Sequence, residues 1–428
     1  MTKAQTAARI GVVGLGYVGL PLAVEFAEAG HHVVGLDVDA SKVKALRAGT
    51  SYVEDIPSER FRALADRIHV TTRYADLAQV DAVIIAVPTP LTENREPDLQ
   101  PLISSGAALA GVLQEGQLVV LESTTYPGTT RDRLAPLLEE SGLRAGRSFN
   151  LAFSPERIDP GRTDYTLRTT PKVVGGLTPA CLKRAVDLYS AVCDEVVPVS
   201  TPEIAEMTKL LENIFRTVNI ALVNELAMLC DRMQIDVWEV VRAAATKPYG
   251  FMSFSPGPGM GGHCLPVDPF YLAWKAREYD MQTEFIELAG EVNAAMPYYC
   301  ADKVAKALND QAKPVRGSRI AILGVSYKAG VGDLRESPAL KIMSLLAEQG
   351  AELSYHDSFV PELTRFGLES RPLDDVLQDA DAAVIVTVHP DLDVERVESA
   401  GAAVVDFRGV TGQGRAAKRA PAKQPARG

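Results

Sequence analysis

The residues best suited to chemistry lie in a run of glycines and prolines that ends on a cysteine and an aspartate. The run is Gly257-Pro258-Gly259-Met260-Gly261-Gly262-His263-Cys264-Leu265-Pro266-Val267-Asp268-Pro269. So many glycines exclude a regular helix or strand, because their backbone entropy is high, and they let the backbone pass close to a ligand. Cys264 is therefore a candidate nucleophile. The alternative is a turn around a buried cysteine, since free cysteine is among the most buried residue types.

A second motif, near the N-terminus, is typical of a dinucleotide site. Gly14-Leu15-Gly16-Tyr17-Val18-Gly19 follows a predicted strand at 9–13 and precedes a predicted helix at 20–29. A strand at 32–36 then ends at Asp37, about twenty residues beyond the glycines, as the fingerprint requires. The helix N-terminus would hold the pyrophosphate. Asp37 would bind the adenosine ribose and repel a 2′-phosphate, which favours NAD over NADP. A glycine-rich turn without a ligand is the less favoured alternative.

Polar residues also follow three later strands. The strands are predicted at 82–87, 118–121 and 151–153. They lead into Pro88-Thr89-Pro90, into Glu122-Ser123-Thr124 and into a segment that contains Glu156 and Arg157. Ligands of open α/β sheets bind beyond the carboxyl ends of strands, so these side chains could face a ligand or a water. The hydroxyls suit a helix cap equally well, and the Glu156 segment suits a solvated loop equally well.

A long helix is predicted over 201–233, where no Gly or Pro follows Pro202. Thr201 can cap it, and Pro202 takes the first helical position. Apolar residues recur at helical spacing along it: Ile204, Met207, Leu211, Ile214, Phe215, Val218, Leu222, Leu226 and Leu229. Its length suggests a link between two domains that also supplies a dimer surface. Lys209 and Asn213 share one face, and their spacing alone favours a solvated polar stripe.

The rest of the sequence is predicted to form a second α/β unit. Helices are expected at 271–279, 283–308 and 339–349, and strands at 319–324, 352–356, 383–388 and 403–407. The first turn, Gly324-Val325-Ser326-Tyr327-Lys328, lacks the full glycine fingerprint, so we expect a relative of the first domain without a second NAD site. Lys328 and Arg335 could hold phosphates or could be ordinary surface charges. Residues 413–428 have the composition of a disordered tail.

The bulk composition limits the class of protein. The 428 residues are enough for two or three domains. A net charge of −11 argues against a nucleic-acid partner. No apolar run is long enough to span a membrane, and the N-terminus does not resemble a signal peptide. The five cysteines are scattered without CxxC spacing, so we expect no disulfide framework, no metal site and a reducing, cytoplasmic setting.

Together these motifs resemble the UDP-glucose/GDP-mannose dehydrogenase family from about residue 10 to about residue 410. The matching motifs are Gly14-Leu15-Gly16-Tyr17-Val18-Gly19-Leu20-Pro21, Glu122-Ser123-Thr124, Pro155-Glu156, Lys209 with Asn213, the loop through Cys264 and Asp268, and Tyr327-Lys328 with Arg335-Glu336-Ser337. UDP-glucose dehydrogenases usually carry Pro-Lys-Asp after the cysteine. The Pro266-Val267-Asp268 found here resembles the UDP-N-acetylglucosamine 6-dehydrogenases, as do Tyr126-Pro127-Gly128-Thr129-Thr130 and the segment 155–161.

The resemblance implies an α/β fold of two Rossmann-like, doubly wound domains joined by a long central helix. It implies an NAD-binding domain at 1–200, a central dimerisation domain with the cysteine loop at 201–312 and a UDP-sugar-binding domain at 313–412. It also implies that a sugar primary alcohol is oxidised to a carboxylate with two NAD molecules reduced, feeding surface polysaccharides such as capsule or O-antigen. Cys264 would capture the aldehyde as a thiohemiacetal, which then becomes a thioester.

The resemblance also assigns roles to five other residues. Asp268 would act as a general base or orient a water. Lys209, with Asn213 beside it, would stabilise negative charge on the substrate oxygen. Glu156 and Thr124 would position or activate the hydrolytic water. The implied cofactor contacts are Gly14, Gly16, Tyr17, Val18, Gly19, Asp37, Lys42, Thr89, Thr124 and Arg335. The implied substrate contacts are Glu156, Arg157, Lys209, Asn213, the loop from Ser253 to Gly257, Gly261 and Lys328.

Several alternatives stay open at this stage. The substrate could be UDP-N-acetylgalactosamine, UDP-N-acetylmannosamine or UDP-glucose, because each pocket contact that separates them is worth only ~1–3 kcal/mol. A single-hydride dehydrogenase of the 6-phosphogluconate or 3-hydroxyacid kind would lack the cysteine loop and the second α/β unit. A non-enzymatic nucleotide-sugar sensor would be expected to have lost the reactive side chains. A homodimer or higher homo-oligomer is expected through the long helix.

Overall fold

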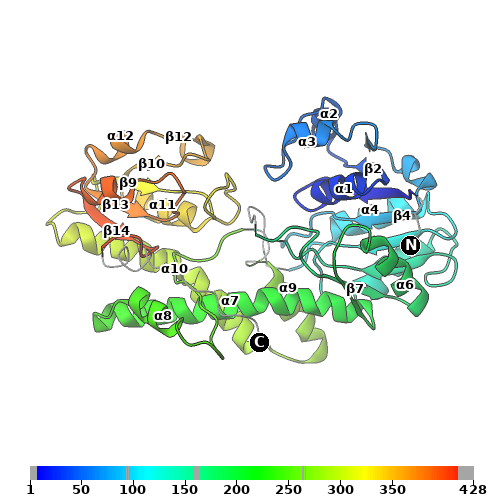
Figure 1. Ribbon diagram of the computed structural model, residues 1–428. Coiled ribbons are helices and arrows are strands. Elements are labelled where there is room, and N and C mark those ends of the chain that lie inside the picture. The colour runs from blue at the N-terminus through cyan, green and yellow to red at the C-terminus, as the bar shows by residue number, and fades with distance from the viewer. Residues whose placement is uncertain are drawn as a thin grey trace. The chain divides into compact units, whose positions relative to one another are not determined.

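The computed structural model describes residues 7–92, 94, 96–158, 164–262, 265 and 267–412 (Figure 1). Two compact units divide the chain: Met1–Glu212 with Phe270–Gln282, and Asn213–Pro269 with Thr283–Gly428. Each unit contains a mainly parallel sheet, and the long helix α7 (Pro202–Met233) includes the boundary between them. The predicted α/β fold with two Rossmann-like sheets is therefore confirmed. The predicted tail, 413–428, lies outside the described residues.

The first unit holds an eight-stranded sheet in the order β3-β2-β1-β4-β5-β6-β7-β8. Its strands are β1 (Arg9–Val13), β2 (His32–Leu36), β3 (Ile68–Thr71), β4 (Ala82–Ile85), β5 (Leu118–Leu121), β6 (Asn150–Phe153), β7 (Lys172–Gly176) and β8 (Val196–Val199). Neighbouring strands are parallel except for β6 and β7. The order of the first six is that of dinucleotide-binding sheets, with the change of direction between β1 and β4.

Helices cover both faces of this sheet, which explains why its central strands are apolar throughout. They are α1 (Gly19–Glu28), α2 (Ala40–Arg47), α3 (Ser58–Arg62), α4 (Gln100–Ala110), α5 (Ala135–Glu139) and α6 (Pro179–Tyr189), with the short turns η1 (Tyr74–Gln79) and η2 (Thr130–Leu134). Successive strand residues serve opposite faces: Val120 lies in one apolar cluster and Val119 in the other. The part of helix α9 (Asp268–Ala276) from Phe270 onward and the turn η3 (Arg277–Tyr279) also belong to this unit, although they lie later in the sequence.

The second unit holds a four-stranded parallel sheet in the order β10-β9-β13-β14. Its elements are β9 (Arg319–Leu323), β10 (Glu352–His356), β13 (Ala382–Ile385), β14 (Ala403–Asp406), the small pair β11 (Glu362–Leu363) and β12 (Leu368–Glu369), the turn η4 (Thr364–Phe366), and helices α8 (Val237–Ala244), α10 (Glu284–Asn309), α11 (Pro338–Glu348), α12 (Leu373–Leu377) and α13 (Val394–Glu398). Apolar clusters lie on both faces here as well.

The first turn of each sheet is built in the same way. Gly14 (φ +91°) and Gly324 (φ +78°) both adopt positive φ, and each donates its N–H to the last carbonyl of the second strand, at 2.8 and 2.9 Å. Asp37 and Asp357 follow those second strands, and each accepts the N–H of the residue after the glycine, at 2.9 and 2.7 Å. Strands β4 and β13 end earlier than predicted, at Ile85 and Ile385, since the chain beyond them crosses these glycines.

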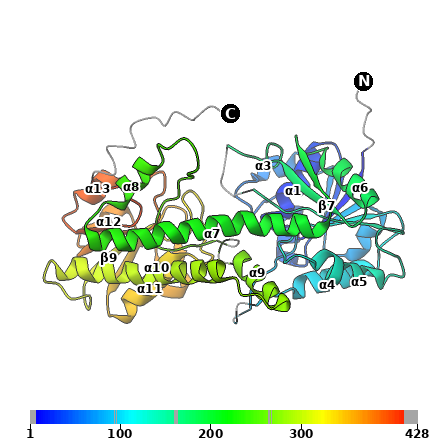
Figure 2. The ribbon, with the colours of Figure 1, turned by 90° about the horizontal axis from the view of Figure 1, so that it is seen from below.

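Helix α7 is drawn along its length in Figure 2. Unlike an ordinary surface helix, it buries several polar side chains and exposes many of its large apolar ones. A buried polar stripe runs along one face: Glu206, Lys209, Asn213, Thr217 and Asn224. Eight large apolar residues are each at least 40% exposed: Ile204, Met207, Leu211, Phe215, Leu222, Leu226, Leu229 and Met233. The solvated-stripe interpretation of Lys209 and Asn213 is therefore wrong, since they are only 7% and 5% exposed. Within the described part of the chain, no helix has the length and apolar character needed to cross a membrane.

Candidate active site

The glycine turn after β1 leaves an opening for a ligand. A Cβ on Gly14 would lie 2.5 Å from the carbonyl oxygen of Ala86, and one on Gly19 would lie 1.8 Å from that of Gly14. Both glycines are thus required by the close approach of other backbone. A Cβ on Gly16 would meet nothing within 4 Å, so this position faces open space. No side chain caps α1, whose N-terminus favours an anion. Of the neighbouring predicted residues, Tyr17 is exposed and Val18 is partly buried.

Asp37 is fixed at the end of β2 beside this turn. Its side chain is nearly buried, and its two oxygens accept the N–H groups of Leu15 and Asp39, each at 2.9 Å. Each carboxylate oxygen keeps a further lone pair, so the group can still accept hydrogen bonds from a ribose. The Nζ of Lys42 lies 3.7 Å from Asp37. Asp37 and Lys42, both predicted cofactor contacts, therefore lie near each other at the carboxyl edge of the sheet.

The loops after β4, β5 and β6 lie at the same edge. The buried Thr89 donates its hydroxyl to the carbonyl of Thr124 at 2.8 Å, which joins two of these loops. Glu156 accepts two backbone N–H groups on Oε1, from Arg157 and Ile158, both at 2.7 Å. The guanidinium of Arg157 pairs with Glu212 at 2.7 Å. These predicted residues thus lie at neighbouring strand ends, whereas Asp159–Gly161 lie outside the described residues.

Sequence reasoning missed a buried charged group behind Glu156. The Nζ of Lys172 lies 3.2 Å from Glu156 Oε2 and 3.1 Å from Glu122 Oε1. Burial acts to raise the pKa of Glu156, yet Lys172, the two backbone N–H groups and Lys209 together bring that pKa below its usual value. Burial raises the pKa of Glu122, although Lys172 opposes this. Lys209 has no ion-pair or hydrogen-bond partner among the described residues.

The second unit positions the other predicted catalytic residues. Asn213, on α7, donates a side-chain hydrogen bond to Asp268, the first residue of α9, and both are buried. Gly262 (φ +89°) donates its N–H to the carbonyl of Arg335 at 2.9 Å, and a Cβ on Gly261 would lie 2.6 Å from Tyr327. The cysteine loop therefore packs against the segment that carries Tyr327 and Arg335. Cys264, the predicted nucleophile, lies outside the described residues.

The predicted substrate loop is held by residues that the sequence analysis did not identify. The N–H of Gly257 donates to Asn224 Oδ1 at 2.9 Å, and Asn224 donates in turn to Asn293 Oδ1 at 2.9 Å. Arg408 lies beside the same glycine, where a Cβ would be 3.0 Å from its Nη1. Asn224 could have been found from its spacing, because it follows Asn213 by three helical turns and shares its face.

Three further predicted contacts differ in their surroundings. Ser253 is exposed and Lys328 is partly buried. The guanidinium of Arg335 pairs with Asp333, with its closest N–O distance at 2.5 Å. Arg335 is therefore held within its own loop in this structure.

The turn after β9 is closed by its own side chains. Ser326 stands where the first unit has Gly16, and it is fully buried. His389 lies 3.2 Å from Ser326 Oγ and 3.0 Å from Asp357 Oδ2, and Phe359 stacks on its ring with centroids 4.8 Å apart. The place that is open in the first unit is occupied here.

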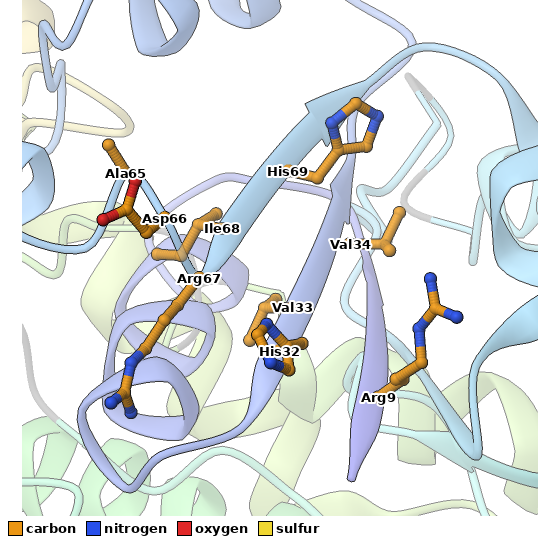
Figure 3. Close-up of a pocket in the computed structure, with 9 residues that line it drawn as sticks. All are labelled: Arg9, His32, Val33, Val34, Ala65, Asp66, Arg67, Ile68 and His69. Carbon is orange, nitrogen blue, oxygen red and sulfur yellow. The ribbon is translucent and has the colours of Figure 1, made fainter. Parts of the chain in front are cut away.

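A cavity of about 590 Å³ lies elsewhere in the first unit (Figure 3). It is lined by Arg9, His32 and Ile68, the first residues of β1, β2 and β3, and by their neighbours. This is the amino edge of the sheet, opposite the edge that carries the predicted site, so the cavity is not the candidate site. Among the described residues, no cluster of His, Cys, Asp and Glu could hold a metal ion.

Comparison with known proteins decides the family. Residues 8–193 match the NAD binding domain of the UDP-glucose/GDP-mannose dehydrogenase family, residues 203–295 its central domain and residues 321–413 its UDP binding domain. The chain belongs to this family. As a UDP-glucose/GDP-mannose dehydrogenase family member it is an NAD-dependent UDP-sugar dehydrogenase, an oxidoreductase that acts on a CH–OH group. The open position at Gly16, the uncapped α1 and the carboxylate of Asp37 fit NAD.

Similar proteins match the chain over most of its length. Protein CapL of Staphylococcus aureus is 40% identical over 350 residues, 81% of each chain. UDP-N-acetyl-D-glucosamine 6-dehydrogenase of Pseudomonas aeruginosa is 37% identical over 354 residues, 82% of this chain and 83% of that one. The solved UDP-D-ManNAc dehydrogenase of Pyrococcus horikoshii superposes with a TM-score of 0.87 at 35% identity, covering 95% of this chain and 96% of that one.

Proposed function

We propose that this dehydrogenase oxidises the C6 hydroxyl of UDP-N-acetylglucosamine to the carboxylate, through a thiohemiacetal and a thioester on Cys264. The observation that carries the proposal is the loop Gly-Gly-His-Cys-Leu-Pro-Val-Asp-Pro, whose aspartate is buried and bound by Asn213. Val267 takes the place of the lysine that is usual in UDP-glucose dehydrogenases. The Pseudomonas relative named for UDP-N-acetylglucosamine supports the same substrate.

Each proposed step uses a group whose surroundings suit it. Lys209, buried and without an ion pair at contact distance among the described residues, would stabilise the alkoxide that forms at the substrate oxygen. Asp268, held by Asn213, would take the hydroxyl proton or orient a water. NAD, when bound, supplies the hydride acceptor for both oxidations. The residues proposed to hold it are Gly14, Gly16, Tyr17, Val18, Gly19, Asp37, Lys42, Thr89, Thr124 and Arg335.

The thiolate of Cys264 would add to the aldehyde carbon, and the resulting thiohemiacetal would lose the second hydride to give a thioester. Water activated by Glu156, with Thr124 beside it, would then attack the thioester carbon. The C–S bond breaks, the thiolate leaves and the carboxylate product forms. Glu156 is suited to this role because its pKa lies below the usual value, so it is ionised and able to accept a proton.

The substrate would be held by Gly257 and the rest of its loop, with Lys328 and Arg408 as nearby cations for the diphosphate. UDP-N-acetylmannosamine is the second candidate, because the similar solved structure from Pyrococcus horikoshii is named for ManNAc. We further propose a dimer through the exposed apolar face of α7, and a role in surface polysaccharide synthesis that the CapL relative supports. A cytoplasmic setting stays a prediction from the cysteines, four of which are free and buried in the described part of the chain.

The test is the yield of NADH per sugar consumed, with UDP-N-acetylglucosamine, its epimers and UDP-glucose measured in parallel. We expect about two NADH per UDP-N-acetylglucosamine and little from UDP-glucose. The Cys264→Ser variant should no longer give two NADH per sugar. The Cys230→Ser variant should still give two, because Cys230 is a buried cysteine outside the loop. One NADH per sugar in the wild type would refute the thiohemiacetal. A full yield from UDP-glucose would refute the amino-sugar assignment, and NAD binding without turnover of any sugar would favour a sensor.

A further inference from the structure

The antiparallel pair β6–β7 extends the sheet beyond its first six strands and places a lysine opposite Glu156. Phe153 pairs with Gly175, and Ala152 pairs with Gly176. Continuing this register past the end of β6 brings Glu156 opposite Lys172, the first residue of β7. The ion pair at 3.2 Å shows that the register continues in the side chains. Glu122 follows β5, the strand on the other side of β6, and completes the group.

This group contains more negative than positive charge. Lys172 lies between two carboxyl groups, and the side chains of Lys172, Glu122 and Glu156 are only 4%, 0% and 15% exposed. Two buried carboxylates and one ammonium leave an excess negative charge, which is costly away from water. One of the two carboxyl groups should therefore hold a proton.

The hydrogen bonds indicate which carboxyl is ionised. Glu156 accepts two backbone N–H groups besides Lys172, and the charge of Lys209 acts on it as well. Glu122 accepts only the Tyr189 hydroxyl, at 2.5 Å, besides Lys172, and its Oε2 finds no partner among the described atoms. Donors stabilise a carboxylate, so the charge belongs on Glu156 and the proton on Glu122.

We propose that Lys172 is a positioning residue that holds Glu156 as an oriented carboxylate, while Glu122 behind it stays protonated. The inference rests on the proposed function, in which Glu156 activates the hydrolytic water. The groups that face Glu156 are Lys172 from β7, Glu122 after β5 and Lys209 from α7. The Arg157 guanidinium beside it is engaged by Glu212. Tyr189 and Cys193 also lie near Lys172 and Glu122.

The experiment measures the ionisation of Glu156 directly, by infrared titration of each variant against a matched Glu156→Gln background. Lys172→Met should raise its titration midpoint by about one to three pH units, because a cation within contact distance is removed. Lys172→Arg keeps the charge and should stay near the wild type. Glu122→Gln mimics the protonated carboxyl and should also leave the midpoint in place. If Lys172→Met does not fold, the double variant Lys172→Gln/Glu122→Gln should show the same rise.

The acid limb of the pH profile for thioester hydrolysis is measured in the same variants. A rise of both the midpoint and the limb in Lys172→Met supports the proposal. An unchanged midpoint would overturn it, and so would an equal rise in Glu122→Gln, since any disturbance of the group would then suffice. A raised midpoint with an unmoved limb would leave the control of charge by Lys172 intact but refute the role of Glu156 in hydrolysis.

Discussion

Glu206 offers a measurement of how a buried acid stabilises the first unit. It lies in the first turns of α7 and is fully buried. Its carboxyl accepts the N–H of Gly128 at 2.6 Å, and the N–H and hydroxyl of Thr130 at 2.9 and 2.7 Å. Burial raises the pKa of Glu206 to about 7, against the lowering effect of these hydrogen bonds. The native protein therefore binds this proton more tightly than the unfolded chain does.

The size and sign of the effect follow from that difference. The pKa rises from 4.5 to about 7, and one pKa unit corresponds to ~1.4 kcal/mol, so the contribution is about 3 kcal/mol. It is fully present below pH 4.5, where both states are protonated. It is lost as the pH rises to about 7, because the unfolded chain releases the proton first. Above that pH, the contribution of Glu206 should no longer change.

The assay is urea unfolding of the wild type and of Glu206→Gln between pH 4.5 and 8, with a single fluorescent reporter. Trp274 lies 5.1 Å from the Tyr126 ring in the first unit, and Trp238→Phe removes the other of the two tryptophans. The difference in unfolding free energy between wild type and variant should fall by about 3 kcal/mol as the pH rises to 7. Glu203→Gln, one turn earlier, should change the slope much less, because the pKa of Glu203 is lowered and its titration lies below this pH range. A difference that does not change with pH would refute the reasoning.

The remaining predictions concern the cofactor turn and the helix surface. Gly16→Ala should leave stability unchanged, since its Cβ meets no protein atom, but it should weaken NAD binding at least ~10-fold in a calorimetric titration. Gly19→Ala should lower both stability and NAD affinity, because its Cβ would lie 1.8 Å from a carbonyl oxygen; equal behaviour of the two variants would contradict the assigned roles. Leu222→Asp should convert the proposed dimer to a monomer in sedimentation without loss of NAD binding, as Leu222 is 54% exposed; an unchanged mass would place the interface elsewhere.

The parallel strands and the first glycine turn could be predicted because their signals are local. Strands β7 and β8 could not be predicted, since they contain residues that are unusual in strands. β7 begins with Lys172 and ends in two glycines, and β8 contains Pro198. The structure explains the glycines: a Cβ on Gly175 would lie 2.3 Å from the Thr201 carbonyl oxygen, and one on Gly176 would lie 2.2 Å from a backbone nitrogen.

Helical periodicity alone could not establish the surroundings of the predicted site residues. Periodicity shows that Lys209 and Asn213 share a face of α7, but it does not show which face the protein covers. Many large apolar side chains of α7 are exposed while Lys209 and Asn213 are buried, so the ordinary rule gave the wrong answer. Lys172 could not be identified from the sequence for another reason. Its importance depends on a strand pairing with Glu156, and the sequence did not indicate that strand.

The closed turn at Ser326 and His389 has a consequence for the order of events in the proposed reaction. Of the two glycine turns compared among the described residues, one is open to a dinucleotide, yet the proposed oxidation to a carboxylate would remove two hydrides from one sugar. The spent nucleotide must therefore depart and a fresh one arrive in the middle of the turnover. During that exchange a free aldehyde could diffuse away. The covalent bond to Cys264 would then keep the half-oxidised sugar bound to the enzyme while one nucleotide is exchanged for the next.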